Sequence, residues 1–132
     1  MRRLCYISGP ITDPDLSKLA ANLQAFTNAE NYLWREGFAA LNPASDWAAY
    51  CLGGITYEMC IERDVTLLHA VAAVDGANWQ LPGWKTSQGA VTEYHICRDL
   101  GIPCVEADEG IGRLHDVLRD DFVASLSCAP DD

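Results

Sequence analysis

Short apolar runs alternate with helical patterns along this chain, and that alternation limits the fold more than any other feature of the sequence. The β-favouring runs lie at 4–7, 38–41, 71–74 and 104–106, and a segment with helical spacing follows each of them. Strands that are separated by helices form parallel sheets covered on both faces. We therefore expect one α/β domain over residues 1–132, a flavodoxin-like three-layer sandwich with a four- or five-stranded parallel sheet.

Capping residues indicate where the helices begin and end. Asp13-Pro14 predicts the start of the first helix, and Gly37 predicts its end. Thr56 is expected to open the second helix, and the third is expected to span 88–100. A last amphipathic helix is expected at 111–125.

Charge and hydropathy exclude several classes of partner. The chain has 132 residues and a formal net charge of −10. Because binding to a nucleic-acid backbone needs a basic surface, we expect no nucleic acid polymer as a partner. No apolar stretch approaches the length of a membrane span and no signal peptide is evident, so we expect no membrane partner and a cytoplasmic location.

The six cysteines are interpreted as free thiols, with disulfide pairing as the alternative. Free cysteine packs as a small hydrophobic residue, and the cytosol is reducing. The three histidines show no ligand spacing with the cysteines, so no metal is expected. Neither a GxxxxGK nor a GxGxxG pattern is present, and we expect no cofactor.

Ligands of parallel sheets bind beyond the carboxyl ends of the strands. The loops expected there are 8–14, 42–55 and 75–88. The first strand delivers four candidate residues to this edge: Tyr6, Ser8, Gly9 and Pro10. Small residues allow a ligand to approach the backbone closely, although an ordinary strand-to-helix turn has the same composition.

The loop at 75–88 is long for a compact domain, and such loops are commonly functional. Lys85, Ser87 and the free N–H groups of the following helix could form an anion cradle. The alternative is an ordinary helix cap beside a solvated lysine.

Two carboxylates are candidates for chemistry. Glu93 lies near the start of the third helix, where the helix dipole would keep it ionised at neutral pH. An ionised, positioned carboxylate is what attack on an anomeric carbon needs, but a glutamate at this position can also merely satisfy the dipole. Asp64 lies in the middle of the second helix, either on a solvated face or pointing to the pocket.

Four segments together carry a family resemblance. They are Tyr6-Ile7-Ser8-Gly9-Pro10-Ile11, Asn42-Pro43, Arg63-Asp64 and Ser87-x-Gly89-x-x-x-Glu93. In order and spacing they resemble the nucleoside 2-deoxyribosyltransferase superfamily, which includes the 2-deoxynucleoside 5-phosphate N-hydrolases. The stretch Leu81-Pro82-Gly83-Trp84 is more similar to a branch other than the best-studied enzymes.

The resemblance implies a role for each matched residue. Glu93 matches the nucleophile, Tyr6 the tyrosine that orients it, and Asp64 the second acid near the leaving base. Ser87 and Gly89 match positions that contact the sugar or the 5-phosphate.

The implied activity is cleavage or exchange of the N-glycosidic bond of a nucleoside or nucleotide through a ribosyl-enzyme ester. Water would then give hydrolysis, and a second base would give transfer. Pro10 stands where the phosphohydrolases have a hydroxyl side chain, so phosphate binding stays open. A non-catalytic nucleotide-binding module of the same fold is the alternative.

Aromatic side chains suggest an assembly and a base site. Trp47, Tyr50 and Trp79 are expected to be exposed, and exposed apolar patches commonly mark interfaces, so we expect a homodimer or larger homo-oligomer. Trp84 or Trp47 is expected to cover the flat face of the base.

Overall fold

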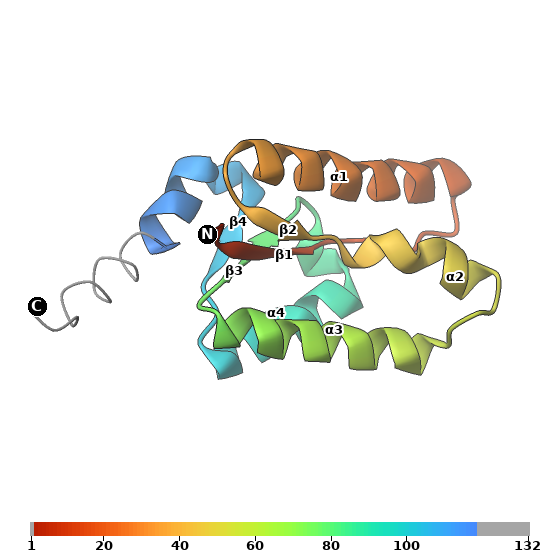
Figure 1. Cartoon of the computed structure of the whole chain (residues 1–132). Coiled ribbons are helices and arrows are strands. Elements are labelled where there is room, and N and C mark those ends of the chain that lie inside the picture. The colour runs from red at the N-terminus through yellow and green to blue at the C-terminus, as the bar shows by residue number, and fades with distance from the viewer. Residues whose placement is uncertain (1, 119–132) are drawn as a thin grey trace, which may run out of the picture.

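The computed structural model describes residues 2–118 of the chain, except for the side chain of Ala48. Strands and helices alternate along it (Figure 1). The strands are β1 (Leu4–Ser8), β2 (Ala39–Leu41), β3 (Ala77–Gln80) and β4 (Cys104–Glu106). The α-helices are α1 (Leu16–Arg35), α2 (Trp47–Cys51), α3 (Tyr57–Ala73) and α4 (Gln88–Leu100), and residues 111–118 are also helical. Short 3-10 helices are η1 (Pro43–Asp46), η2 (Trp84–Thr86) and η3 (Ala107–Glu109).

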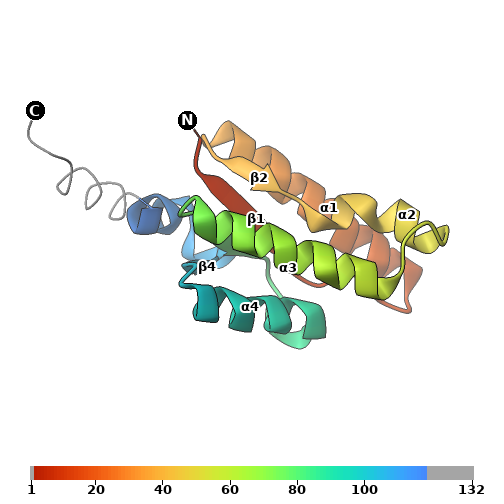
Figure 2. The same cartoon turned by 60° about the horizontal axis from the view of Figure 1, so that its bottom comes forward.

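The four strands form one parallel sheet in the order β2-β1-β3-β4. Helix α1 covers one face, and α3 and α4 lie side by side on the other (Figures 1 and 2). The prediction of a three-layer α/β sandwich with a parallel sheet is therefore confirmed. Helix α2 lies beyond the carboxyl end of β1, where it can contribute to a site (Figure 1).

Strand β1 is central in the sheet, and its side chains alternate between the two faces. Cys5 and Ile7 join the core cluster on the α1 side, which also contains Leu114 and Leu118 from residues 111–118. Tyr6 joins the cluster on the α3 and α4 side. The residues that follow the parity of Tyr6 therefore face the two helices that carry the candidate carboxylates.

The start of the first helix differs from the expectation. Asp15, not Asp13, is the N-cap, and its side chain accepts a hydrogen bond from the Ser17 backbone. Asp13 instead accepts a bond of 2.9 Å from the Asp15 N–H, which shapes the turn before the cap. At the other end, Gly37 has a φ of 100° and follows the last helical turn as predicted.

The third strand was placed wrongly from the sequence. Residues 71–74 continue α3 and its C-cap, and β3 lies at 77–80 within the expected loop. A sharp turn separates them: Asp75 has a φ of 54°, and a Cβ on Gly76 would lie 2.4 Å from the Leu4 carbonyl oxygen. The expected loop at 42–55 also contains η1 and α2. The expected helix end at 119–125 lies outside the described residues.

The cysteines of the described part of the chain are free thiols: Cys5, Cys51, Cys60, Cys97 and Cys104. Cys128 lies outside the described residues. Among the described helices, none is long and apolar enough to cross a bilayer.

Candidate active site

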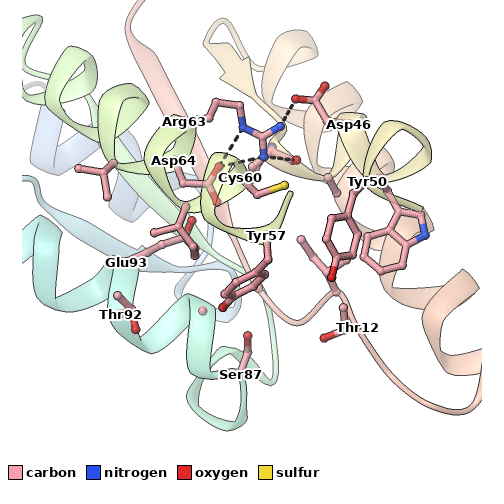
Figure 3. Close-up of a pocket in the computed structure, with 18 of the residues that line it drawn as sticks. Thr12, Asp46, Tyr50, Tyr57, Cys60, Arg63, Asp64, Ser87, Thr92 and Glu93 are labelled. Atoms are coloured by element: carbon pink, nitrogen blue, oxygen red, sulfur yellow. Dashed lines mark hydrogen bonds and ion pairs between the residues drawn. The ribbon is translucent and has the colours of Figure 1, made fainter. Parts of the chain in front are cut away.

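A cavity of about 350 Å³ opens at the carboxyl ends of the strands. Its walls come from the loop after β1, from η1 and α2, from the first half of α3, and from the start of α4. In Figure 3, Asp64 and Glu93 lie on one side of the cavity and Tyr50 lies on the other. A volume of this size suits a small organic molecule.

The hydroxyl of Tyr6 donates a hydrogen bond to Oε2 of Glu93. Tyr6 is fully buried in β1, and Glu93 lies in the second turn of α4. Because Ser87 caps α4 by accepting from the Ala90 N–H, the helix begins at a defined residue and aims Glu93 at the sheet. The contact that the resemblance implied between tyrosine and glutamate is therefore present.

Burial, and to a smaller extent the charge of Asp64, raise the pKa of Glu93 from 4.5 to about 8. The hydrogen bond from Tyr6, the nearby hydroxyl of Ser8 and the charge of Arg63 oppose this shift. The expectation that the helix dipole keeps Glu93 ionised at neutral pH is wrong, because the cost of burying the carboxylate outweighs the stabilising groups.

Asp64 faces the cavity rather than a solvated face, and its side chain is 19% exposed. Burial raises the pKa of its carboxyl, whereas Arg63 and the nearby hydroxyl of Tyr6 lower it. Tyr6 lies near both acids, and its own pKa is raised well above 10 by burial and by the charges of Glu93 and Asp64. Two interacting carboxyl groups with raised pKa values titrate as a pair.

Arg63 ties this acid to the cavity wall. Its Nε and Nη2 atoms donate to Asp64 Oδ1 at 3.1 and 2.9 Å, and Nη2 also donates to the Pro43 carbonyl at 2.9 Å. Nη1 donates to Oδ2 of Asp46 (Figure 3). The guanidinium thus joins α3 to η1 and fixes the orientation of Asp64.

Polar side chains of three neighbouring strands form a chain of hydrogen bonds next to the site. Ser8, whose side chain is buried, donates a bond of 2.7 Å to Oδ1 of Asn78 in the neighbouring strand. Asn78 in turn donates to the Cys104 sulfur at 3.6 Å. Ser8 is therefore held in place next to Glu93.

Three further sequence candidates lie in or next to the wall of the cavity, and they differ in what they contribute. Gly9 lines it, and a Cβ at this position would lie 2.9 Å from that of Leu81, so only glycine fits. Pro10 is half-buried and is not part of the cavity lining. Asn42 caps η1 by accepting from the Ala44 N–H and donates to Glu30, and it borders a neighbouring hollow instead.

The loop that contains Trp84 turns away from the cavity. The Trp84 ring stacks on Tyr94 with centroids 5.0 Å apart, and its Nε1 donates to Glu106 at 2.9 Å. Lys85 is exposed and lies over the Trp84 ring, whereas Ser87 and Gly89 line the cavity. Lys85 therefore lies apart from Ser87, with which it was expected to form an anion cradle. Trp84 lies outside the cavity, where it was expected to cover the base.

Aromatic residues cover the side of the cavity opposite the acids. Trp47 and Tyr50 of α2 have ring centroids 5.4 Å apart, and both are half-buried rather than exposed. Trp79, also expected to be exposed, is buried in β3. Tyr57, at the first turn of α3, completes the lining.

The comparison with protein families covers most of this architecture. A family model described as a domain of unknown function, DUF4406, matches residues 3–106. The chain belongs to the DUF4406 family. The matched part of this DUF4406 chain includes every residue that lines the cavity, together with Tyr6. A search of curated proteins finds no match.

Sequence reasoning missed several residues that line the cavity of this DUF4406 domain. They are Thr12, Asp46, Tyr57 and Cys60. Proximity to Arg63-Asp64 in the same helix could have indicated Tyr57 and Cys60, which lie seven and four residues before Asp64. Among the described residues, His, Cys, Asp and Glu form no group of three or more that could hold a metal ion.

Proposed function

We propose that this domain cleaves or exchanges the N-glycosidic bond of a nucleoside or nucleoside monophosphate, with Glu93 as the nucleophile. The observation that carries the proposal is the hydrogen bond from Tyr6 to Glu93 at the wall of a cavity that Asp64 also lines. The four segments of this chain that resemble the nucleoside 2-deoxyribosyltransferase superfamily support the same assignment.

The two carboxyl groups provide an acid and a nucleophile in one pair. Below about pH 8 the pair retains a proton, because burial and mutual repulsion disfavour two charges. Glu93 becomes the nucleophilic anion when this proton moves from Glu93 to Asp64, and the Tyr6 hydroxyl orients the attacking oxygen. An oxocarbenium-like centre at C1 is stabilised by this carboxylate and collapses onto it.

In the first step, a Glu93 oxygen forms an ester bond to C1 of the sugar while the bond from C1 to the base nitrogen breaks. The base nitrogen keeps the electron pair and takes the proton from Asp64. In the second step, water attacks C1, the ester bond breaks to restore the Glu93 carboxylate, and the water proton passes to Asp64. A second base that attacks C1 in place of water gives transfer.

Replacement of Glu93 by glutamine tests this proposal. Glu93→Gln should lower base release by at least about 10³-fold, since the amide cannot form the ester efficiently. Mass spectrometry of the wild-type protein, quenched during turnover of a slow 2-fluoro-deoxyribosyl nucleoside, should find a sugar adduct on the peptide that contains Glu93. Full activity of Glu93→Gln would refute the assignment.

A non-catalytic nucleotide-binding module is the second candidate, and the raised pKa of Glu93 favours it, because a neutral carboxyl is a poor nucleophile. Calorimetry distinguishes the two. Nucleoside binding without release of free base, and without an adduct, would favour the module.

A further inference from the structure

The cavity contains more negative than positive groups. Asp46, Asp64 and Glu93 line it together with the guanidinium of Arg63. With Glu93 neutral, two carboxylates face one cation, and ionisation of Glu93 adds a third carboxylate. A ligand with its own negative charge therefore needs a positive group that these acids do not already occupy.

Arg63 is not such a group. A guanidinium has five N–H donors, and four hydrogen bonds join Arg63 to Asp46, Asp64 and Pro43. Its charge is matched by two carboxylates within salt-bridge distance. A phosphate at this position would have to displace one of them.

The other cations of residues 2–118 do not line the cavity. Lys85 is exposed and lies over the Trp84 ring, and Arg98 lies over Tyr94. Arg2 and Arg3 donate to backbone carbonyls of Trp34 and Asp75, near the amino ends of the strands. The start of α4 offers backbone N–H groups, but among the described residues no positively charged side chain other than Arg63 joins them in the lining.

We infer that this cavity selects an uncharged nucleoside over the corresponding nucleoside 5′-monophosphate. The inference rests on the proposed function for the nature of the ligand, and on the occupied guanidinium of Arg63 for the selectivity. Tyr50 and Trp47 suit the flat face of the base, and the sugar then lies toward the acids on the other side.

The experiment compares four deoxynucleosides with their 5′-monophosphates on the full chain. We expect kcat/KM for base release to favour the nucleosides by at least about 10-fold, and calorimetry on Glu93→Gln to show the same preference in Kd. Equal or tighter binding of the monophosphates, or binding of neither class, would overturn the inference. Nucleoside-selective binding without base release from the wild-type protein would leave the inference standing and remove the proposed function.

The variant Asp46→Asn tests the cause of the selectivity. It releases one partner of Arg63 and removes one negative charge, so the preference for nucleosides over monophosphates should shrink several-fold. Asp99→Asn is the matched control, because it makes the same charge change at an exposed position outside the cavity. An equal preference in Asp46→Asn and Asp99→Asn would overturn the role of the occupied guanidinium.

Discussion

Tyr6 and Glu93 are 87 positions apart in the sequence, and the hydroxyl of the first donates a hydrogen bond to the carboxyl of the second. Tyr6 is held by the central strand, and Glu93 is held by a helix with a defined N-cap. The contact therefore joins two rigid elements at the edge of the sheet. A carboxylate held by a helix and a strand is positioned more precisely than one held by a loop.

Tyr6→Phe should reduce activity less than Glu93→Gln does. The variant keeps the nucleophile and loses the group that orients it, so we expect kcat for base release to fall about 10- to 100-fold. Steady-state kinetics on one deoxynucleoside would measure this. A loss as large as that of Glu93→Gln, in a protein with unchanged circular dichroism, would contradict an orienting role.

The pH dependence of kcat/KM should report the proton that the two acids share. Because the pair loses its remaining proton near pH 8, we expect a decline above about pH 8. Asp64→Asn removes the acid and also a charge that raises the pKa of Glu93. In that variant activity should be low and should lack the decline above pH 8. A wild-type rate that instead rises through pH 8 would show that Glu93 has to lose its proton before attack.

Glu93→Gln should stabilise the protein at high pH. The folded-state pKa of Glu93 is raised from 4.5 to about 8, so the folded state binds this proton more tightly than the unfolded state does. Its contribution to stability is full below about pH 4.5 and is lost as pH rises through about 8. We expect the variant to gain about 3 kcal/mol in unfolding free energy over wild type between pH 5 and pH 8. Urea unfolding at both values would measure this, and parallel pH profiles would count against it.

Trp47→Ala and Trp84→Ala should behave differently. Trp47 lines the cavity, so its removal should weaken nucleoside binding by about 1–3 kcal/mol and abolish ligand-induced fluorescence quenching. Trp84 stacks on Tyr94 and donates to Glu106, so its removal should lower stability by about 2 kcal/mol and leave the quenching in place. Quenching that disappears in Trp84→Ala alone would reverse the two assignments.

The chain should assemble as a homodimer or larger homo-oligomer. Large apolar side chains remain exposed between the end of α2 and the start of α3, namely Leu52 at 87%, Tyr57 at 59% and Met59 at 51%. Such a patch commonly marks an interface. Light scattering at tens of micromolar tests the prediction, and a monomer at that concentration would argue against it.

Strand β3 explains why the fold could be predicted only in part. The flanking elements were placed well because their apolar spacing and caps agree. In β3, however, Asn78 and Gln80 are buried polar residues, and a buried parallel strand is expected to be apolar. The apolar run at 71–74 was mistaken for the strand because a buried helix end is as apolar as a buried strand, and Val71 is buried on the inner face of α3. The polar strand lies under the site, which is where a sequence most often departs from the pattern of its fold.

The candidate site was also predictable only in part. Glu93 and Asp64 stood out through the family resemblance, since each alone has an ordinary explanation as a helix residue. The raised pKa of Glu93 could not be predicted, because it depends on burial by residues from other elements. The place of Tyr57 depends on how α2 and α3 pack over the strand ends.

Arg63 couples the position of η1 in the cavity wall to the pKa of the candidate acid Asp64. The same guanidinium holds Asp46 and Pro43 in η1 and Asp64 in α3. Any displacement of η1 that widens the entrance removes acceptors from Arg63 and leaves its charge to Asp64 alone. The pKa of Asp64 would then fall as the entrance opens. Ligand entry and the protonation of the candidate acid are therefore coupled through Arg63.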